Sequence, residues 1–239
     1  MKLFKVDYSF YLLVLILIFS PKQNDIIKIL LCLFFHELGH LIFVLVSGYN
    51  VKSINVSGIG IFMELKEHKN IFFKDLLIYS GGILINLLLM ICFNSLKDIC
   101  KILIMINIIP VYPLDGFNFI KSVLSYYIPY YYSSLIMDVL GVFLVFLILI
   151  YFIVIKKDFF IIINCLYLLY INIKRLLNFK LTYKGWLLNR YLNSYDYNVK
   201  NVTLFDNIDN IYYKYFNVNL VINETKVKEK ELLKFIFEK

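Results

Sequence analysis

Two histidines and a glutamate lie within five residues of one another in LLCLFFHELGHLIFVLV, residues 30–46. The neighbours are hydrophobic, which predicts a membrane-spanning helix, where an ionisable side chain costs at least about 2–3 kcal/mol. Residues four apart share one helix face, so His36 and His40 can direct two imidazoles at one metal ion. Glu37 lies about 100° further round the helix and can take a proton from a metal-bound water. The spacing therefore indicates zinc-dependent hydrolysis.

A catalytic zinc needs a third protein ligand and an open position for water. His68 lies in the polar segment KEHKN, where we expect a solvated side chain, and Asp138 is expected near a membrane interface. Asp115 follows Pro110 and Pro113 in NIIPVYPLDGFNF, and those prolines must interrupt a helix. A carboxylate on non-helical backbone can reach a metal without competing helix geometry. We therefore predict that Asp115 is the third ligand.

The composition predicts an all-α polytopic membrane protein. The chain is 61% hydrophobic and 18% charged, against about 45–50% apolar and 25% charged in soluble domains. We expect about six transmembrane helices, and the fourth is the one that the prolines break. Broken backbone at membrane depth needs protein or a water-filled cavity around it, so the break points to a site. The expected spans are residues 7–20, 26–47, 73–94, 100–124, 134–155 and 158–174.

Two further segments flank this predicted membrane domain, residues 1–174 with a core at 26–125. Residues 50–65 alternate in polarity and predict a small β-hairpin between the second and third spans, either an ordinary surface hairpin or an edge that accepts an extended peptide. Residues 174–239 hold 12 Lys or Arg against 7 Asp or Glu. We therefore expect 175–239 to be a small α/β cytoplasmic tail attracted to anionic lipid. Its final segment, YFNVNLVINETKVKEKELLKFIFEK, predicts a strand, a turn and an amphipathic helix.

The charge pattern also bears on orientation and partners. Positive charges favour both termini in the cytoplasm of a multi-pass integral membrane protein. The basic residues of the tail form no compact cluster, so we expect the lipid bilayer and no nucleic acid as a partner. The four cysteines lie in or beside apolar runs and are expected to act as small buried hydrophobes.

The two motifs together resemble the site-2 protease family of intramembrane zinc metalloproteases. HExxH lies in one span, and N-x-x-P-x-x-P-L-D-G follows in the span that the prolines break. This resemblance implies that His36, His40 and Asp115 bind Zn²⁺ and that Glu37 activates water. The residues that match the second motif are Asn107, Pro110, Pro113, Leu114, Asp115 and Gly116.

Within that family the layout is similar to the stage IV sporulation protease of endospore-forming bacteria. This likeness implies cleavage of the pro-sequence of a sigma-factor precursor, regulation by inhibitory membrane proteins, and a location in the membrane around the forespore. Phe117 and Asn118 depart from the second glycine and basic residue that commonly follow Asp-Gly. The tail is about half the length of a nucleotide-sensing CBS pair, which allows at most a partial CBS-like unit.

Two asparagines are further candidates for this site. Asn86, in SGGILIN, is a candidate for binding substrate backbone, with an interhelical hydrogen bond as the alternative. Asn107 is a candidate for substrate binding or, more simply, for holding the broken segment.

Other functions remain open at this point. The same protease chemistry could cleave another membrane-anchored regulator. A metal-ion transporter would require further ionisable residues on other spans, and these are few. An inactive membrane scaffold is disfavoured by the intact HExxH motif and Asp115. The sequence leaves the oligomeric state open.

Overall fold

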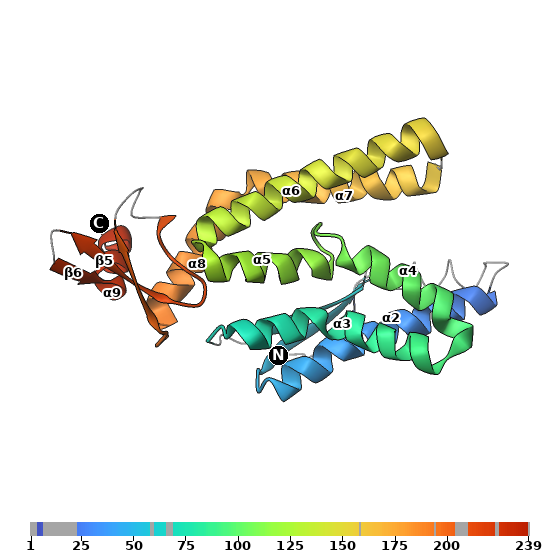
Figure 1. The fold of residues 1–239 in the computed structure, drawn as a ribbon, viewed down its shortest axis with the longest axis horizontal. Helices are drawn as coiled ribbons and strands as arrows, with labels where there is room; N and C mark the ends of the chain where they lie inside the picture. The colour runs from blue at the N-terminus through green and yellow to red at the C-terminus, as the bar shows by residue number, and fades with distance from the viewer. Residues whose placement is uncertain are drawn as a thin grey trace. The chain divides into compact units, whose positions relative to one another are not determined.

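The computed structural model describes residues 4–6, 23–57, 60–65, 69–157, 159–193, 195–203, 210–222 and 225–238. The described chain is mostly helical, with two small sheets (Figure 1). It divides into two compact units. Unit 1 comprises Met1–His68 and Phe73–Ile109, and unit 2 comprises Lys69–Phe72 and Pro110–Lys239.

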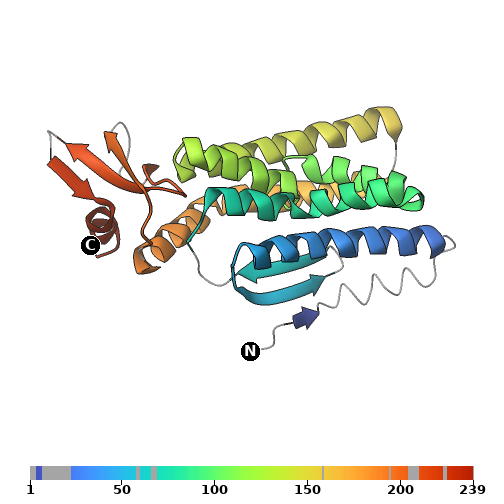
Figure 2. The ribbon, with the colours of Figure 1, turned by 60° about the horizontal axis from the view of Figure 1, so that its bottom comes forward.

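Unit 1 contains long helices and a three-stranded sheet. Strand β1 pairs parallel with β2, and β2 pairs antiparallel with β3, so β2 is central. The sheet lies alongside α2 (Figure 2). Helix α2 has 24 residues and is therefore about 36 Å long, enough to cross a bilayer core of about 30 Å. The elements are β1 (Phe4–Val6), α2 (Gln23–Val46), β2 (Val51–Ser57), β3 (Gly60–Leu65), α3 (Phe72–Cys92), η1 (Asn94–Leu96) and α4 (Lys97–Ile108).

Unit 2 contains further helices and a second sheet, and α6 and α7 lie side by side in it (Figure 1). Helix α7 is bent by 59° relative to α8 at a short break. The elements are α5 (Asp115–Tyr127), α6 (Tyr130–Tyr151), η2 (Phe152–Lys156), α7 (Phe159–Leu177), α8 (Phe179–Asn193), β4 (Val199–Thr203), β5 (Asn217–Ile222), β6 (Thr225–Lys228) and α9 (Glu229–Phe237).

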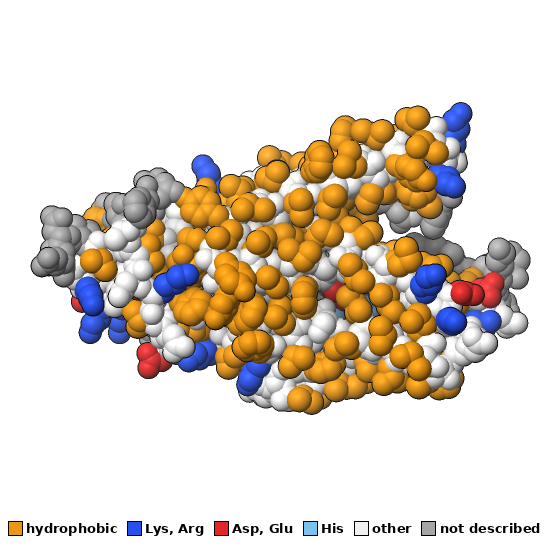
Figure 3. Space-filling view, in the orientation of Figure 1, with side chains coloured by type: hydrophobic (Ala, Val, Ile, Leu, Met, Phe, Trp, Pro, Cys, Tyr) orange, Lys and Arg blue, Asp and Glu red, His pale blue; other side chains and the backbone are white. Residues whose placement is uncertain are grey.

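Within the described residues, three helices are long and apolar enough to cross a membrane, or four if the bent α7–α8 pair forms one span. The three are Asn24–Val46, Phe72–Cys92 and Tyr130–Lys156, which correspond to the predicted spans 26–47, 73–94 and 134–155. Hydrophobic side chains are exposed along them, as the visible face of α6 shows (Figure 3). The predicted span 7–20 lies outside the described residues, and the count of six stays a prediction.

The predicted fourth span is interrupted at the two prolines, as expected. Helix α4 ends at Ile108, and Ile109 is extended, the conformation that a residue before proline favours. Helix α5 begins at Asp115. The two helices have 12 and 13 residues, so each is only about 18–20 Å long and is too short to cross a bilayer core alone.

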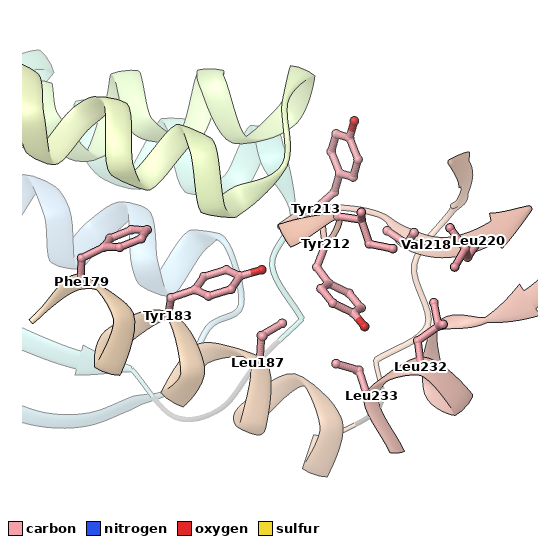
Figure 4. Close-up of a cluster of buried hydrophobic side chains, with 10 residues drawn as sticks. Phe179, Tyr183, Leu187, Tyr212, Tyr213, Val218, Leu220, Leu232 and Leu233 are labelled. Atoms are coloured by element: carbon pink, nitrogen blue, oxygen red, sulfur yellow. The ribbon is translucent and has the colours of Figure 1, made fainter. Parts of the chain in front are cut away.

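The end of the chain forms a small sheet with helices packed against it. Strand β5 is central, parallel to β4 and antiparallel to β6. The predicted strand and terminal helix correspond to β5 and α9, and β6 is a further strand that the sequence did not predict; residues 223–224, between β5 and β6, lie outside the described residues. Figure 4 shows the apolar core, in which Tyr212 points toward Leu233.

A buried ion pair joins α8 to α9 within this core. Arg190 of α8 pairs with Glu229, the first residue of α9, and both are buried. Arg190 also donates to the carbonyl oxygen of Tyr213 at 2.8 Å, and Glu229 accepts the N–H of Val218 at 2.6 Å. These bonds tie both helices to the strand region.

Candidate metal centre

The two histidines of HELGH face the same point inside unit 1. His36 and His40 are both buried on α2, at 4% and 8% exposure. Their Nε2 atoms are 3.3 Å apart. Two nitrogens bound to a tetrahedral zinc at about 2.0–2.1 Å are themselves about 3.3 Å apart. The spacing of the two imidazoles therefore fits one shared zinc ion.

Both rings are held through the other nitrogen, Nδ1. The Nδ1 atom of His40 lies 2.7 Å from the carbonyl oxygen of Ile78 on α3. A carbonyl can only accept, so this Nδ1 carries the proton and donates it. The Nε2 atom of His40 then presents a lone pair, as a neutral metal-binding histidine requires.

Asn86 is the hydrogen-bond partner of Nδ1 of His36. Its Nδ2 atom lies 3.0 Å from Nδ1 of His36, and Asn86 is fully buried. Among the residues that the structure describes, its Oδ1 has no hydrogen-bond partner. Turning the amide over exchanges these two atoms, so that Oδ1 accepts a hydrogen bond from the N–H at Nδ1 of His36. With that bond, Nε2 of His36 carries no proton and, like Nε2 of His40, is able to bind a metal ion.

With the amide in this orientation, both Nε2 atoms, 3.3 Å apart, can be directed at one cation. The same distance fits two ligands of one zinc ion and also a hydrogen bond in which one Nε2 carries a proton. Asn86 therefore makes an interhelical hydrogen bond, the alternative allowed by the sequence. Its candidate role in substrate binding stays a prediction.

Glycines on both helices make this geometry possible. A Cβ atom on Gly82 would lie 2.4 Å from Nε2 of His36 and 2.6 Å from Nε2 of His40. Gly39 and Gly81 bring the two backbones together, because a Cβ on Gly39 would lie 2.5 Å from the carbonyl oxygen of Gly81. The SGG sequence of α3 was the only signal for Gly82, and nothing local pointed to the carbonyl of Ile78.

Glu37 and Cys32 lie on the same helix as the imidazoles. Glu37 is half-buried, which suits a carboxylate that must exchange a proton with water.

Cys32, one turn before His36, is fully buried, and its Sγ lies 3.4 Å from Sγ of Cys100 on α4. Cys32 thus packs against another thiol, in agreement with its expected role as a small buried hydrophobe.

The predicted third ligand belongs to unit 2. Asp115 is the first residue of α5, half-buried, and it follows the extended Leu114. A carboxylate in the first turn of a helix is stabilised by the partial positive charge of the helix N-terminus. Asp115 thus places a carboxylate at the start of α5, directly after the break between α4 and α5.

The remaining candidates have other surroundings. Nδ2 of Asn107 donates to the carbonyl oxygen of Leu103, one turn back in α4, at 3.0 Å. This bond lies within the last turns before the break. Asp138 is buried inside α6, not exposed at an interface, and it accepts a hydrogen bond from Nε of Arg175 at 2.6 Å. The ion pair explains its burial and removes it as the third ligand. His68 lies outside the described residues.

Comparisons with known proteins identify the fold. No protein-family model matches the sequence, and no curated protein matches it. Among solved structures, the site-2 protease from Methanocaldococcus jannaschii is similar, with a TM-score of 0.56 and 20% sequence identity. The match covers 72% of this chain and 90% of the other. The chain therefore has the fold of a site-2 protease, and its apolar helices are those of a membrane protein.

Proposed function

We propose that this chain is an intramembrane zinc metalloendopeptidase. His36 and His40 each offer an imidazole nitrogen and Asp115 a carboxylate oxygen, which together are a suitable ligand set for catalytic zinc. The observation that carries the proposal is the 3.3 Å separation of the two Nε2 atoms, with each Nδ1 hydrogen-bonded to α3.

Only a few residues take part in the proposed peptide hydrolysis. Zinc held by His36, His40 and Asp115 would lower the pKa of a bound water and would polarise the carbonyl of the scissile peptide. The carboxylate of Glu37 takes the proton of the attacking water and returns it to the leaving amine nitrogen. Ile78 and Asn86 keep the imidazoles in the tautomer that binds metal.

The proposed substrate is a membrane-associated protein, cleaved near the cytoplasmic face of a bacterial membrane. The layout of the sequence favours the pro-sequence of a sporulation sigma-factor precursor in the membrane around the forespore, with inhibitory membrane proteins as regulators. Another membrane-anchored regulator is the alternative substrate. Cleavage requires extended peptide, because a helix hides its amides, and the edge strand β3 offers backbone groups for pairing.

Co-expression with candidate sigma-factor precursors tests this proposal. We expect a shortened product with the wild-type chain and none with Glu37→Gln, although that variant keeps its zinc by elemental analysis. Asp25→Asn is the matched control, because Asp25 is an exposed acidic residue of the same helix. Normal cleavage by Glu37→Gln would rule out Glu37 as the base and, with it, the proposed mechanism.

A further inference from the structure

Helix α7 holds the backbone of the segment that carries Asp115. The amide nitrogen Nδ2 of Asn172 donates to the carbonyl oxygen of Tyr112 at 2.8 Å. Asn172 is 1% exposed, and its Nδ2 also bonds the carbonyl oxygen of Leu168 in its own helix. A buried amide that joins a regular helix to a non-helical segment restrains that segment, because breaking the bond leaves buried polar groups unpaired.

One turn further along α7, a cation contacts the same segment on both sides of Asp115. The guanidinium carbon of Arg175 lies 4.5 Å from the ring centre of Tyr112 and 4.8 Å from that of Phe117. Tyr112 precedes Asp115 by three residues and Phe117 follows it by two. The two rings also pack edge to face, with centres 5.7 Å apart. Cation–π contacts of this kind strengthen when they are removed from water.

The third member of the cluster orients the cation. Asp138 of α6 is 2% exposed and accepts the hydrogen bond from Nε of Arg175 at 2.6 Å. Arg175 keeps 26% of its side chain exposed, so the pair is partly solvated, and such a pair contributes little net stability. Ionisable residues within a candidate membrane span are costly and usually serve a site. The pair is therefore better explained by geometry than by stability.

We infer that Asn172, Arg175 and Asp138 form a clamp that positions the carboxylate of Asp115 for metal binding. We call these three residues the α7 clamp; the inference rests on the proposed zinc protease function. Asp115 begins a helix directly after an extended residue, so regular secondary structure on its N-terminal side cannot set its position. The clamp supplies that restraint through the backbone of Tyr112 and the rings of Tyr112 and Phe117.

Metal affinity in purified, detergent-solubilised protein tests the clamp. The variants are Arg175→Met and Asn172→Leu, with Lys174→Met as the control, because Lys174 is the exposed cation next to Arg175. We expect zinc affinity, measured by competition with a chelator, to fall about tenfold or more in both variants, the range for residues that orient a ligand. The control should bind zinc as the wild type does.

A spectroscopic readout separates positioning from folding. Co²⁺ in place of zinc gives visible absorption bands that depend on coordination geometry. We expect altered bands in the monodisperse fraction of both clamp variants. Arg175→Lys keeps the ion pair but not the flat contact with the rings, so its affinity should be intermediate. It also serves as the deciding variant if Arg175→Met yields no folded protein.

Two results would overturn different parts of this picture. If the folded clamp variants have the zinc affinity and Co²⁺ bands of the wild type, the three residues only stabilise the packing of α6 against α7. Wild-type zinc binding by Asp115→Ala would instead remove Asp115 as a ligand and contradict the proposed site itself. A loss in Asp115→Ala without a loss in the clamp variants rejects the clamp alone.

Discussion

In unit 1 the proposed zinc ligands are positioned by a regular helix and by the absence of side chains, whereas in unit 2 side chains position the proposed ligand. His36 and His40 take their spacing from one helix turn, and Gly82 leaves the space that their rings occupy. Asp115 follows an interruption between helices, and Asn172 and Arg175 contact the residues around it. Side chains on a regular helix need free space around them, whereas a side chain that follows an irregular segment needs contacts that fix its position.

Removal of a ligand from each region should have the largest effect. We expect His40→Ala and Asp115→Ala each to lower zinc affinity at least about a hundredfold, more than the loss of an orienting residue. Elemental analysis of purified protein measures this, with Asp98→Ala, an exposed acidic residue of α4, as the control. Full zinc content in Asp115→Ala would mean that the third ligand is another residue. The contrast between the two units in how they position zinc ligands would then be rejected.

Filling the space beside the imidazoles should have the next largest effect. In Gly82→Ala, the new Cβ would lie within 2.6 Å of both Nε2 atoms, so the rings or the helices must move. We expect zinc affinity to fall about tenfold to a hundredfold. Gly185→Ala is the matched control, because a Cβ there meets nothing within 4 Å among the described residues. Equal zinc binding by the two variants would mean that clearance at Gly82 does not position the rings.

Two substitutions of Asn86 should have opposite effects on zinc binding. Asn86→Leu removes the partner of Nδ1 of His36, and we expect about tenfold weaker zinc binding. Asn86→Asp keeps an oxygen acceptor, so it should bind zinc at least as well as the wild type. Competition with a chelator measures both. If the aspartate variant is as weak as the leucine variant, the amide does not accept from the imidazole.

The smallest effect on the metal should come from the tail. Glu229→Ala leaves the buried guanidinium of Arg190 without its carboxylate, which costs about 3–5 kcal/mol of tail stability. Protease protection of residues 179–238 should fall while zinc content stays constant. Glu231→Ala, an exposed residue of the same helix, is the control. A loss of zinc in Glu229→Ala would show that the tail supports the metal site.

Several features followed directly from local patterns in the sequence. HExxH placed two imidazoles on one helix face, and they do face one point. Pro110 and Pro113 predicted the interruption between α4 and α5, because proline cannot continue a helix. The apolar runs predicted three long helices close to their observed bounds. Each of these depends on residues within a few turns of one another.

The partners of those residues depended on the tertiary structure. The sequence alone determined which side chains could bind a metal, because helix spacing and proline geometry are local properties of the chain. The fold decided that Ile78 and Asn86 orient the imidazoles, from 38 and 50 residues away. It likewise decided that Asn172 reaches Tyr112 across 60 residues. No local period encodes such hydrogen bonds, because they form only when packing brings separate helices together.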